Sequence, residues 1–304
     1  MCSSCFAIPS VTIKLLTTAA ALIYGQRSFT TNSNKWTRWI TFAITVVISL
    51  ILSAIGVFLL VLSVNPDFRK RNFVNLCVGQ NLKGSPLDVH RCFVLEQGNV
   101  TGKVMEFGPG PGTNFKCFQN MTSAASIEKY VAVEPNSYFE EKIEEERKAR
   151  GLEFPLEFVG IKGENVDIPE QGIYDVVVLT HVLCSVDSAE VVLANAEKAL
   201  KPGGRLIVLE HVLASEGSAL FHIQRQMVAP VLNIVGNGCK FLDLHRALED
   251  FLGDRFDLDI TKFEAPVPSF MFFARPHIKG IAVKDTLKLR NDHSPKSLQH
   301  CQQH

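Results

Sequence analysis

Residues 103–115 read KVMEFGPGPGTNF, a short apolar strand that leads into three alternating glycines. Gly108, Gly110 and Gly112 give the pattern G-x-G-x-G directly after the strand predicted at 104–107. Glycine is needed where a backbone bends sharply or where a ligand approaches it closely, so the pattern predicts a nucleotide-binding loop. Taken alone, the same pattern fits an ordinary turn between a strand and a helix equally well.

Three further stretches favour a parallel sheet with a nucleotide site. A strand predicted at 130–134 (YVAVE) ends in an acid about twenty residues beyond the loop, where a carboxylate can accept hydrogen bonds from ribose hydroxyls. The apolar run 173–180 is typical of a central strand buried on both faces, and a Pro-Gly-Gly turn at 202–204 leads into another strand. Strands and helices that alternate from 103 to 283 predict an α/β fold.

The residues around the loop distinguish between cofactors. A dinucleotide fingerprint, G-x-G-x-x-G, needs its last glycine where this chain has Thr113. Glu106 lies just before the loop, where an acid repels phosphate but can accept a hydrogen bond from an ammonium group. S-adenosyl-L-methionine carries an amino-acid end and a sulfonium and no phosphate. The electrostatics therefore favour S-adenosylmethionine over NAD.

The motifs EFGPGPG, VAVEP, YDVVVLTHVL and LKPGGRLIVLEHV, in this order, resemble a class I methyltransferase. More closely, THVLCSV, LEHV, GCKF and ARPHIKGIAVK resemble the membrane-anchored thiol S-methyltransferases, also called methyltransferase-like seven proteins, over about 103–284. The resemblance implies a Rossmann-like α/β sheet with helices on both faces. It implies methyl transfer from S-adenosylmethionine to small thiols such as hydrogen sulfide. It also implies an endoplasmic reticulum or lipid-droplet membrane, with the domain facing the cytosol.

The chain departs from the family pattern in and after the loop. Pro109 and Pro111 stand where such families usually carry Cys and Thr or similar residues, and Glu134 stands where Asp is common. The glycines themselves are kept, so we expect cofactor binding to be preserved and substrate specificity to differ.

The resemblance also implies which residues touch the cofactor. They lie at or just after the ends of the first four strands: Glu106, Gly108, Gly110 and Gly112 at the amino-acid end, Glu134 at the ribose, Gly163, Glu164 and Asn165 at the adenine edge, and Thr180 near the methyl group. Glu164 fits a solvated loop acid equally well.

Two histidines are the candidate catalytic residues. His181 and His211 end adjacent predicted strands, on the side where open α/β sheets bind ligands. A neutral imidazole can take a thiol proton or stabilise the thiolate. A thiol with a pKa of about 8.5 needs no strong base to lose its proton. We rank His181 first. For each histidine, the alternative is a side chain satisfied by backbone hydrogen bonds near the pocket.

Residues 40–64 carry no charged side chain and predict a transmembrane helix. Trp36 and Trp39 precede them, as suits a membrane interface. Basic residues stand on both flanks, so the positive-inside rule does not orient this helix. A shorter apolar run at 11–24 leaves open whether the N-terminal segment 1–39 also spans the membrane.

The remaining boundaries follow from composition. We expect a connecting segment of one or two helices at 65–100, the methyltransferase domain at 101–284 and a disordered tail at 285–304. The apolar stretch 219–241 fits either a lid over a lipophilic substrate or simple helix packing.

Charge and cysteine usage exclude some functions. The formal net charge is +0, which leaves no electrostatic footprint for nucleic acid. The 8 cysteines are scattered, which predicts neither a disulfide framework nor a metal site and favours a reducing, cytosol-facing compartment. Sequons at Asn99 and Asn120 matter only in a lumen, and we discount them here.

The sequence leaves the acceptor and the oligomeric state open. A quinone, a lipid or a hydroxyl compound is the alternative acceptor to a thiol. A non-catalytic membrane or lipid-droplet protein that retains the fold is the alternative to an enzyme.

Overall fold

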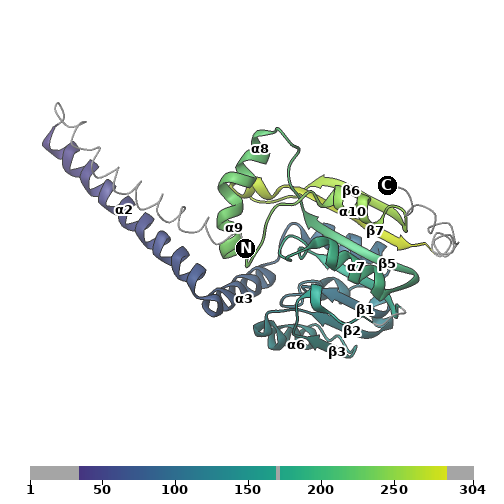
Figure 1. Cartoon of the computed structure of the whole chain (residues 1–304). Coiled ribbons are helices and arrows are strands. Elements are labelled where there is room, and N and C mark those ends of the chain that lie inside the picture. The colour runs from purple at the N-terminus through teal and green to yellow at the C-terminus, as the bar shows by residue number, and fades with distance from the viewer. Residues whose placement is uncertain (1–33, 169–171, 286–304) are drawn as a thin grey trace, which may run out of the picture.

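The computed structural model describes residues 34–168 and 172–285, and Figure 1 shows their arrangement. The shorter apolar run at 11–24 and the tail from 286 onward lie outside the described residues, so their predictions stay untested.

A mixed seven-stranded sheet in the order β3-β2-β1-β4-β5-β7-β6 forms the centre of the fold. Its strands are β1 (Gly102–Phe107), β2 (Ile127–Val133), β3 (Leu156–Val159), β4 (Tyr174–Thr180), β5 (Leu200–His211), β6 (Phe256–Glu264) and β7 (Pro276–Lys284). Strands β1 to β5 pair in parallel, and β7 runs antiparallel between β5 and β6. The chain order reverses between β1 and β4, and open sheets of this type bind ligands outside the carboxyl ends of the strands at that point.

Helices cover both faces of the sheet, which confirms the predicted fold class. Strand β4 shows why its sequence is apolar throughout: Val176 and Val178 pack in one buried cluster, and Val177 and Leu179 pack in the other. On the first side lie α4 (Asp88–Gln97), α5 (Phe115–Phe118) and α6 (Glu140–Ala149), and on the second lie α7 (Ala189–Ala199) and α10 (Leu244–Leu252). The short segments are η2 (Ser123–Ser126), η3 (Ser137–Phe139), η4 (Gly163–Asn165), α8 (Ala219–His222), the π-helix η5 (Ile223–Val228), α9 (Ala229–Val235) and η6 (Ser269–Ala274).

Helix α2 (Lys35–Val64) has the length and composition to cross a membrane. Its 30 residues have a mean hydropathy of 2.9 over the most apolar window, of which 17% is buried. A helix of this length spans roughly 45 Å, more than the hydrocarbon core needs. It begins at Lys35 rather than at the predicted residue 40, and it projects away from the domain in Figure 1.

The segment between α2 and the sheet contains two helices. Asn65 caps α3 (Pro66–Lys83), because its side chain accepts a hydrogen bond from the Phe68 N–H at 3.0 Å. Helix α4 packs on the sheet through Val94 and Leu95. The packed domain therefore begins at α4, earlier than the predicted boundary at residue 101.

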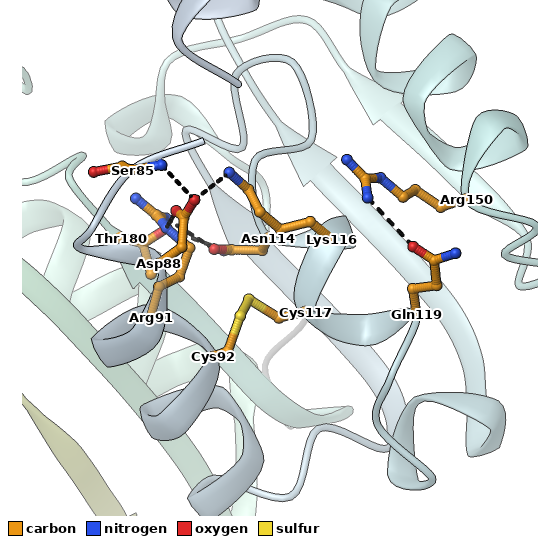
Figure 2. Close-up of a disulfide and its surroundings, with 10 residues drawn as sticks. All are labelled: Ser85, Asp88, Arg91, Cys92, Asn114, Lys116, Cys117, Gln119, Arg150 and Thr180. Carbon is orange, nitrogen blue, oxygen red and sulfur yellow. Dashed lines mark hydrogen bonds and ion pairs between the residues drawn. A yellow bond between two sulfur atoms is a disulfide. The ribbon is translucent and has the colours of Figure 1, made fainter. Parts of the chain in front are cut away.

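Helices α4 and α5 are joined by a disulfide between Cys92 and Cys117, whose Cα atoms lie 5.0 Å apart (Figure 2). The prediction that the scattered cysteines stay unpaired is wrong for these two. They are 25 positions apart in sequence, and only the packing of α4 beside α5 brings them together.

Candidate active site

The glycine loop after β1 takes a left-handed backbone at each of its glycines, with φ of 64° at Gly108, 56° at Gly110 and 80° at Gly112. A Cβ on Gly108 would lie 2.6 Å from Val182, and one on Gly112 would lie 2.7 Å from Phe115. Packing alone therefore requires glycine at these two positions. A Cβ on Gly110 would meet nothing nearer than the Phe139 ring at 3.9 Å, so the middle glycine leaves space that a ligand can occupy.

Glu134 follows β2 and faces this open glycine. Its carboxylate accepts hydrogen bonds from the Asn136 N–H at 2.9 Å and from the Gly110 N–H. Only 7% of Glu134 is exposed, and burial raises its pKa to about 7 against the opposing effect of these hydrogen bonds. The structure thus brings together the loop and the acid that the sequence assigns to the two ends of one cofactor.

Glu106 lies deeper, in a network of buried polar side chains. One carboxylate oxygen accepts hydrogen bonds from Asn114 Nδ2 at 2.7 Å and from Thr180 Oγ1 at 3.4 Å, and the other accepts from the Tyr130 hydroxyl. Burial raises the Glu106 pKa to about 8 although Arg91 lowers it. The carboxyl group is therefore already engaged by the protein, and its contribution in this structure is to hold Asn114 and Thr180 in place.

Arg91 reaches this network from α4. Its Nη1 donates to Asn114 Oδ1 at 2.9 Å, and Figure 2 shows the two side chains meeting close to the Cys92–Cys117 disulfide. Its Nη2 lies 3.2 Å from His181 Nδ1. One guanidinium thus links the glycine-loop side of the site to the histidine side.

His181 has both ring nitrogens in hydrogen bonds. Nδ1 accepts from Arg91, and Nε2 lies 3.1 Å from Nε2 of His277, whose Nδ1 lies 3.1 Å from the Arg275 carbonyl. Because that carbonyl can only accept, the consistent assignment protonates His277 at Nδ1 and His181 at Nε2. Burial lowers the His181 pKa well below its ordinary value. His181 is therefore a neutral side chain with no free lone pair.

The turn after His181 is held by Glu210. Its Oε1 accepts from the Val182 and Leu183 N–H groups at 2.8 and 2.9 Å. His181 itself has a φ of 55°, which is rare for a residue with a Cβ. These two bonds to a buried acid stabilise that conformation. Burial raises the Glu210 pKa to about 7.

His211 lies beside two thiols. Its Nε2 is 3.2 Å from Cys239 Sγ, which is 3.5 Å from Cys184 Sγ. Nδ1 is buried without a hydrogen-bond partner. Burial alone would lower the His211 pKa, but its interactions with Cys184 and Glu210 outweigh burial, and the pKa is raised. Of the two histidines predicted to be catalytic, His211 is the one with a ring nitrogen that has no hydrogen-bond partner.

The same three side chains also form a ligand set that a metal could use. One ligand atom from each of Cys184, His211 and Cys239 lies within 4.8 Å of the others. Two thiols and an imidazole are ligands that zinc accepts. The sequence motifs predict no metal site because these residues are far apart along the chain.

Known proteins resemble this chain in sequence and in fold. The family model described as a methyltransferase domain matches residues 87–255. Human thiol S-methyltransferase TMT1A is 33% identical over 183 residues, which cover 60% of this chain and 70% of that protein. Human thiol S-methyltransferase TMT1B is 33% identical over 188 residues, covering 61% of this chain and 72% of that protein.

This chain belongs to the thiol S-methyltransferase family. It is therefore an S-adenosylmethionine-dependent methyltransferase. The fold agrees with a solved structure: the methyltransferase bound to the Trm112 activator from Haloferax volcanii has a TM-score of 0.50 and 11% sequence identity, covering 70% of this chain and 97% of that one.

The residues of this family member fit the donor. The open position at Gly110 is what a ligand needs in order to approach the loop backbone, and the buried Glu134 carboxylate beside it can accept hydrogen bonds from ribose hydroxyls. Neither contact depends on a phosphate group or on a metal ion, which agrees with a donor that carries no phosphate.

The residues predicted to contact the adenine lie in the loop after β3. A Cβ on Gly163 would lie 2.8 Å from Phe107, so the loop after β3 packs tightly on the end of β1. Glu164 Oε1 accepts from the Asp187 and Ser188 N–H groups at 2.6 and 3.3 Å, which ties this loop to the start of α7. Asn165 is exposed. Glu164 therefore has a structural partner, in addition to any contact with a ligand.

We call the glycine loop 108–112 together with Glu134 the donor cradle. Two surface hollows of the described residues lie outside this cradle. One is lined by Asp243, Arg246 and Asp250 on and near α10, and the other borders the loop only at Pro111, beside Lys142 of α6. Neither is lined by the loop glycines or the histidines, so we assign the site from the cradle residues themselves.

Sequence reasoning missed five residues of the site: Arg91, Asn114, Glu210, Cys239 and His277. The motifs LEHV, GCKF and ARPHIKG contain three of them, so their family resemblance was the available signal. Nothing local marks Arg91 or Asn114, because their roles depend on contacts across the fold.

Proposed function

We propose that this chain transfers a methyl group from S-adenosylmethionine to a small, lipophilic thiol while anchored to a membrane by α2. The observation that carries the proposal is the pairing of Glu134 with the open Gly110 at one end of the site and of His211 with two thiols at the other. The thiol S-methyltransferase names of the relatives support the choice of acceptor.

The chemistry needs little from the protein besides alignment. S-adenosylmethionine supplies an electrophilic methyl group on a sulfonium, whose carbon–sulfur bond breaks as the thiolate sulfur bonds to that carbon. The electron pair stays on the leaving sulfur, so the products are a thioether and S-adenosylhomocysteine. The chain must hold the nucleophile in line and accept the thiol proton.

His211 is the proton acceptor in this proposal. When its Nε2–H donates to Cys239, Nδ1 keeps a lone pair without a partner. His181 is a positioning residue, because Arg91 and His277 occupy both of its nitrogens. This reverses the order that we assign to the two histidines from the sequence.

The surroundings of the site suit a lipophilic acceptor. Ile234 of α9 packs against Leu59 and Leu62 at the end of α2, and Cys239 follows a few residues later. Met227 and Phe270 are exposed at 69% and 77%. An acceptor that dissolves in the bilayer therefore meets apolar side chains where α9 packs against the end of α2. The endoplasmic reticulum membrane, or that of a lipid droplet, is the expected location.

A screen of methylated products tests the proposal. The full chain in detergent or nanodiscs is incubated with S-adenosylmethionine and matched sets of thiols, phenols, quinones and lipids, and products are measured by mass spectrometry. S-methylated products that require His211 support it. Turnover confined to oxygen acceptors contradicts the thiol assignment, and donor binding without any product contradicts catalysis on these acceptors.

A further inference from the structure

Cys184, His211 and Cys239 meet at the carboxyl edge of the sheet, and we call these three residues the thiol cluster. Cys184 lies in the turn after β4, His211 is the last residue of β5, and Cys239 follows α9. One ligand atom from each lies within 4.8 Å of the others. Three segments far apart in the chain thus bring two sulfurs and one ring nitrogen together.

The spacing of these atoms is close to that of a tetrahedral zinc site. Zn²⁺ binds a cysteine sulfur at about 2.3 Å and a histidine nitrogen at about 2.0–2.1 Å, so two sulfurs lie about 3.8 Å apart and a sulfur and a nitrogen about 3.6 Å apart. In the structure, Cys239 Sγ lies 3.5 Å from Cys184 Sγ and 3.2 Å from His211 Nε2. Both separations are within about 0.4 Å of the tetrahedral values, so a metal ion requires only small side-chain movements.

Backbone hydrogen bonds hold the three segments together without a metal. The Lys240 N–H donates to the Cys184 carbonyl at 2.9 Å, and the Leu213 N–H donates to the Leu242 carbonyl at 2.9 Å. The ligands are therefore preorganised, and little ordering of the chain opposes binding. Cys184 is buried at 3% exposure, whereas the other two ligands are half-buried and give a metal ion access from the surface.

The charges and donor atoms of the thiol cluster suit zinc. Two cysteine thiolates compensate the charge of Zn²⁺, so the occupied site adds no net charge beside the buried Cys184. Ser185 Oγ lies 3.3 Å from Cys184 Sγ and can donate to that sulfur once the thiol has lost its proton. Thiolate and imidazole ligands favour zinc, whereas magnesium and calcium prefer oxygen ligands.

We propose that the thiol cluster binds one Zn²⁺ ion and that the bound ion inhibits methyl transfer. The inhibition rests on the proposed function, in which Nδ1 of His211 accepts the proton of the acceptor thiol. Binding releases the thiol protons of Cys184 and Cys239, and coordination at Nε2 moves the imidazole proton to Nδ1. The nitrogen that accepts the proton during catalysis then already carries one. The metal-free chain is therefore the active form.

The surroundings of His211 make the bound metal exchangeable. A histidine that binds a metal usually donates its other ring N–H to a carboxylate, a carbonyl or water, and loss of such a partner lowers metal affinity by about 10- to 100-fold. Nδ1 of His211 has no hydrogen-bond partner in the structure. Three protein ligands also leave the fourth position to water. A chelator should therefore remove the ion and restore the active form.

Metal binding is measured first, on the full chain in detergent with a phosphine reductant. Co²⁺ is the spectroscopic probe. Wild type should show a thiolate-to-cobalt charge-transfer band and the strong visible bands of a tetrahedral ion, and Zn²⁺ should displace both. Cys239→Ser should weaken the charge-transfer band, whereas the control Cys77→Ser, which removes a free thiol on α3, should keep it.

Ligands elsewhere in the chain are controlled by the comparison between variants. The sequence holds other residues that can bind Co²⁺ equally in all of these variants: Cys2, Cys5, His293, His300, Cys301 and His304. Bands of the same strength in wild type and Cys239→Ser therefore arise from other residues and overturn the proposal. A wild-type chain without the bands overturns it as well, whether or not any variant folds.

Inhibition is measured second, in a metal buffer that fixes the free Zn²⁺ concentration, because thiol acceptors bind zinc themselves. Turnover of wild type and of Cys77→Ser should fall as free Zn²⁺ rises and return when chelator is added. Cys184→Ser, whatever its basal rate, should need at least about tenfold more free Zn²⁺ for half-inhibition, because it lacks one ligand.

The two measurements separate this proposal from the proposed function. Normal methylation without metal binding overturns the zinc site and leaves the proposed function intact. Bound zinc that leaves turnover unchanged, or raises it, overturns the inhibition. A chain that binds the metal but methylates no thiol contradicts the proposed function and the inhibition together, while the cobalt bands still support the metal site.

Discussion

The Gly110→Ala variant distinguishes two roles of this glycine: space for the methyl donor and a left-handed backbone. Gly110 has a φ of 56°, and a left-handed backbone costs a residue with a Cβ about 1–2 kcal/mol. The new Cβ would lie 3.9 Å from Phe139, so no clash adds to this cost. We therefore expect Gly110→Ala to lower the free energy of unfolding by about 1–2 kcal/mol.

We expect Gly110→Ala to weaken donor binding as well as to lower stability. The methyl group would enter the space next to the Glu134 carboxylate that we assign to the donor. Overpacking a well-fitted site costs about 1–3 kcal/mol, which corresponds to a Kd raised by roughly 5- to 150-fold. Isothermal titration calorimetry with S-adenosylmethionine measures this change, and urea unfolding followed by circular dichroism measures stability.

The chain offers a matched control. Gly151 has a φ of 65° and no atom within 4 Å of the position that a Cβ would take, and it lies after α6, away from the cradle. Gly151→Ala should lose the same stability as Gly110→Ala and bind the donor normally. Gly112→Ala, whose Cβ would lie 2.7 Å from Phe115, should lose more stability, about 2–5 kcal/mol in all. Wild-type affinity in Gly110→Ala would refute the assignment of this loop to the donor.

The remaining predictions concern the ionisable groups of the site. Glu134→Gln should weaken donor binding by about 10- to 150-fold, because hydrogen bonds to a charged group are worth about 1.5–3 kcal/mol. Since the Glu134 pKa is raised to about 7, wild-type affinity should increase as the pH rises from about 6 to 8, and calorimetry should find no such increase in the variant. The raised Glu210 pKa, about 7 against an ordinary 4.5, means that stability falls as the pH rises between these values; urea unfolding of Glu210→Gln should show a shallower fall, and an unchanged slope contradicts a buried, protonated Glu210. His211→Ala should lower kcat by about 30-fold at pH 7, where only about 3% of a thiol with a pKa of about 8.5 is ionised, and kcat should recover as the pH rises through that value. A loss that does not change with pH excludes His211 as the base. His181→Ala should lower turnover more than donor affinity, and an unchanged rate at saturating thiol excludes it from the site.

Much of the fold follows from local signals. The apolar runs at β1, β2 and β4, the glycine loop and the uncharged stretch of α2 are patterns within a few residues of one another. The apolar pattern of a strand, the turn residues of a loop and the length of an apolar helix can each be read from residues that are close in sequence. The order of these elements then restricts the fold, because parallel strands need helical crossovers of one hand.

The roles of single site residues depend on contacts that no local pattern contains. Arg91 meets Asn114 and His181 only because α4 packs under the sheet, and Cys92 meets Cys117 for the same reason. A sequence predicts that a histidine ends a strand. Whether that histidine can accept a proton depends on which of its ring nitrogens already have hydrogen-bond partners. Local sequence motifs therefore predicted an α/β methyltransferase preceded by a helix long enough to cross a membrane. Packing between distant segments decided which histidine keeps a ring nitrogen without a hydrogen-bond partner, because those partners are set by positions in space.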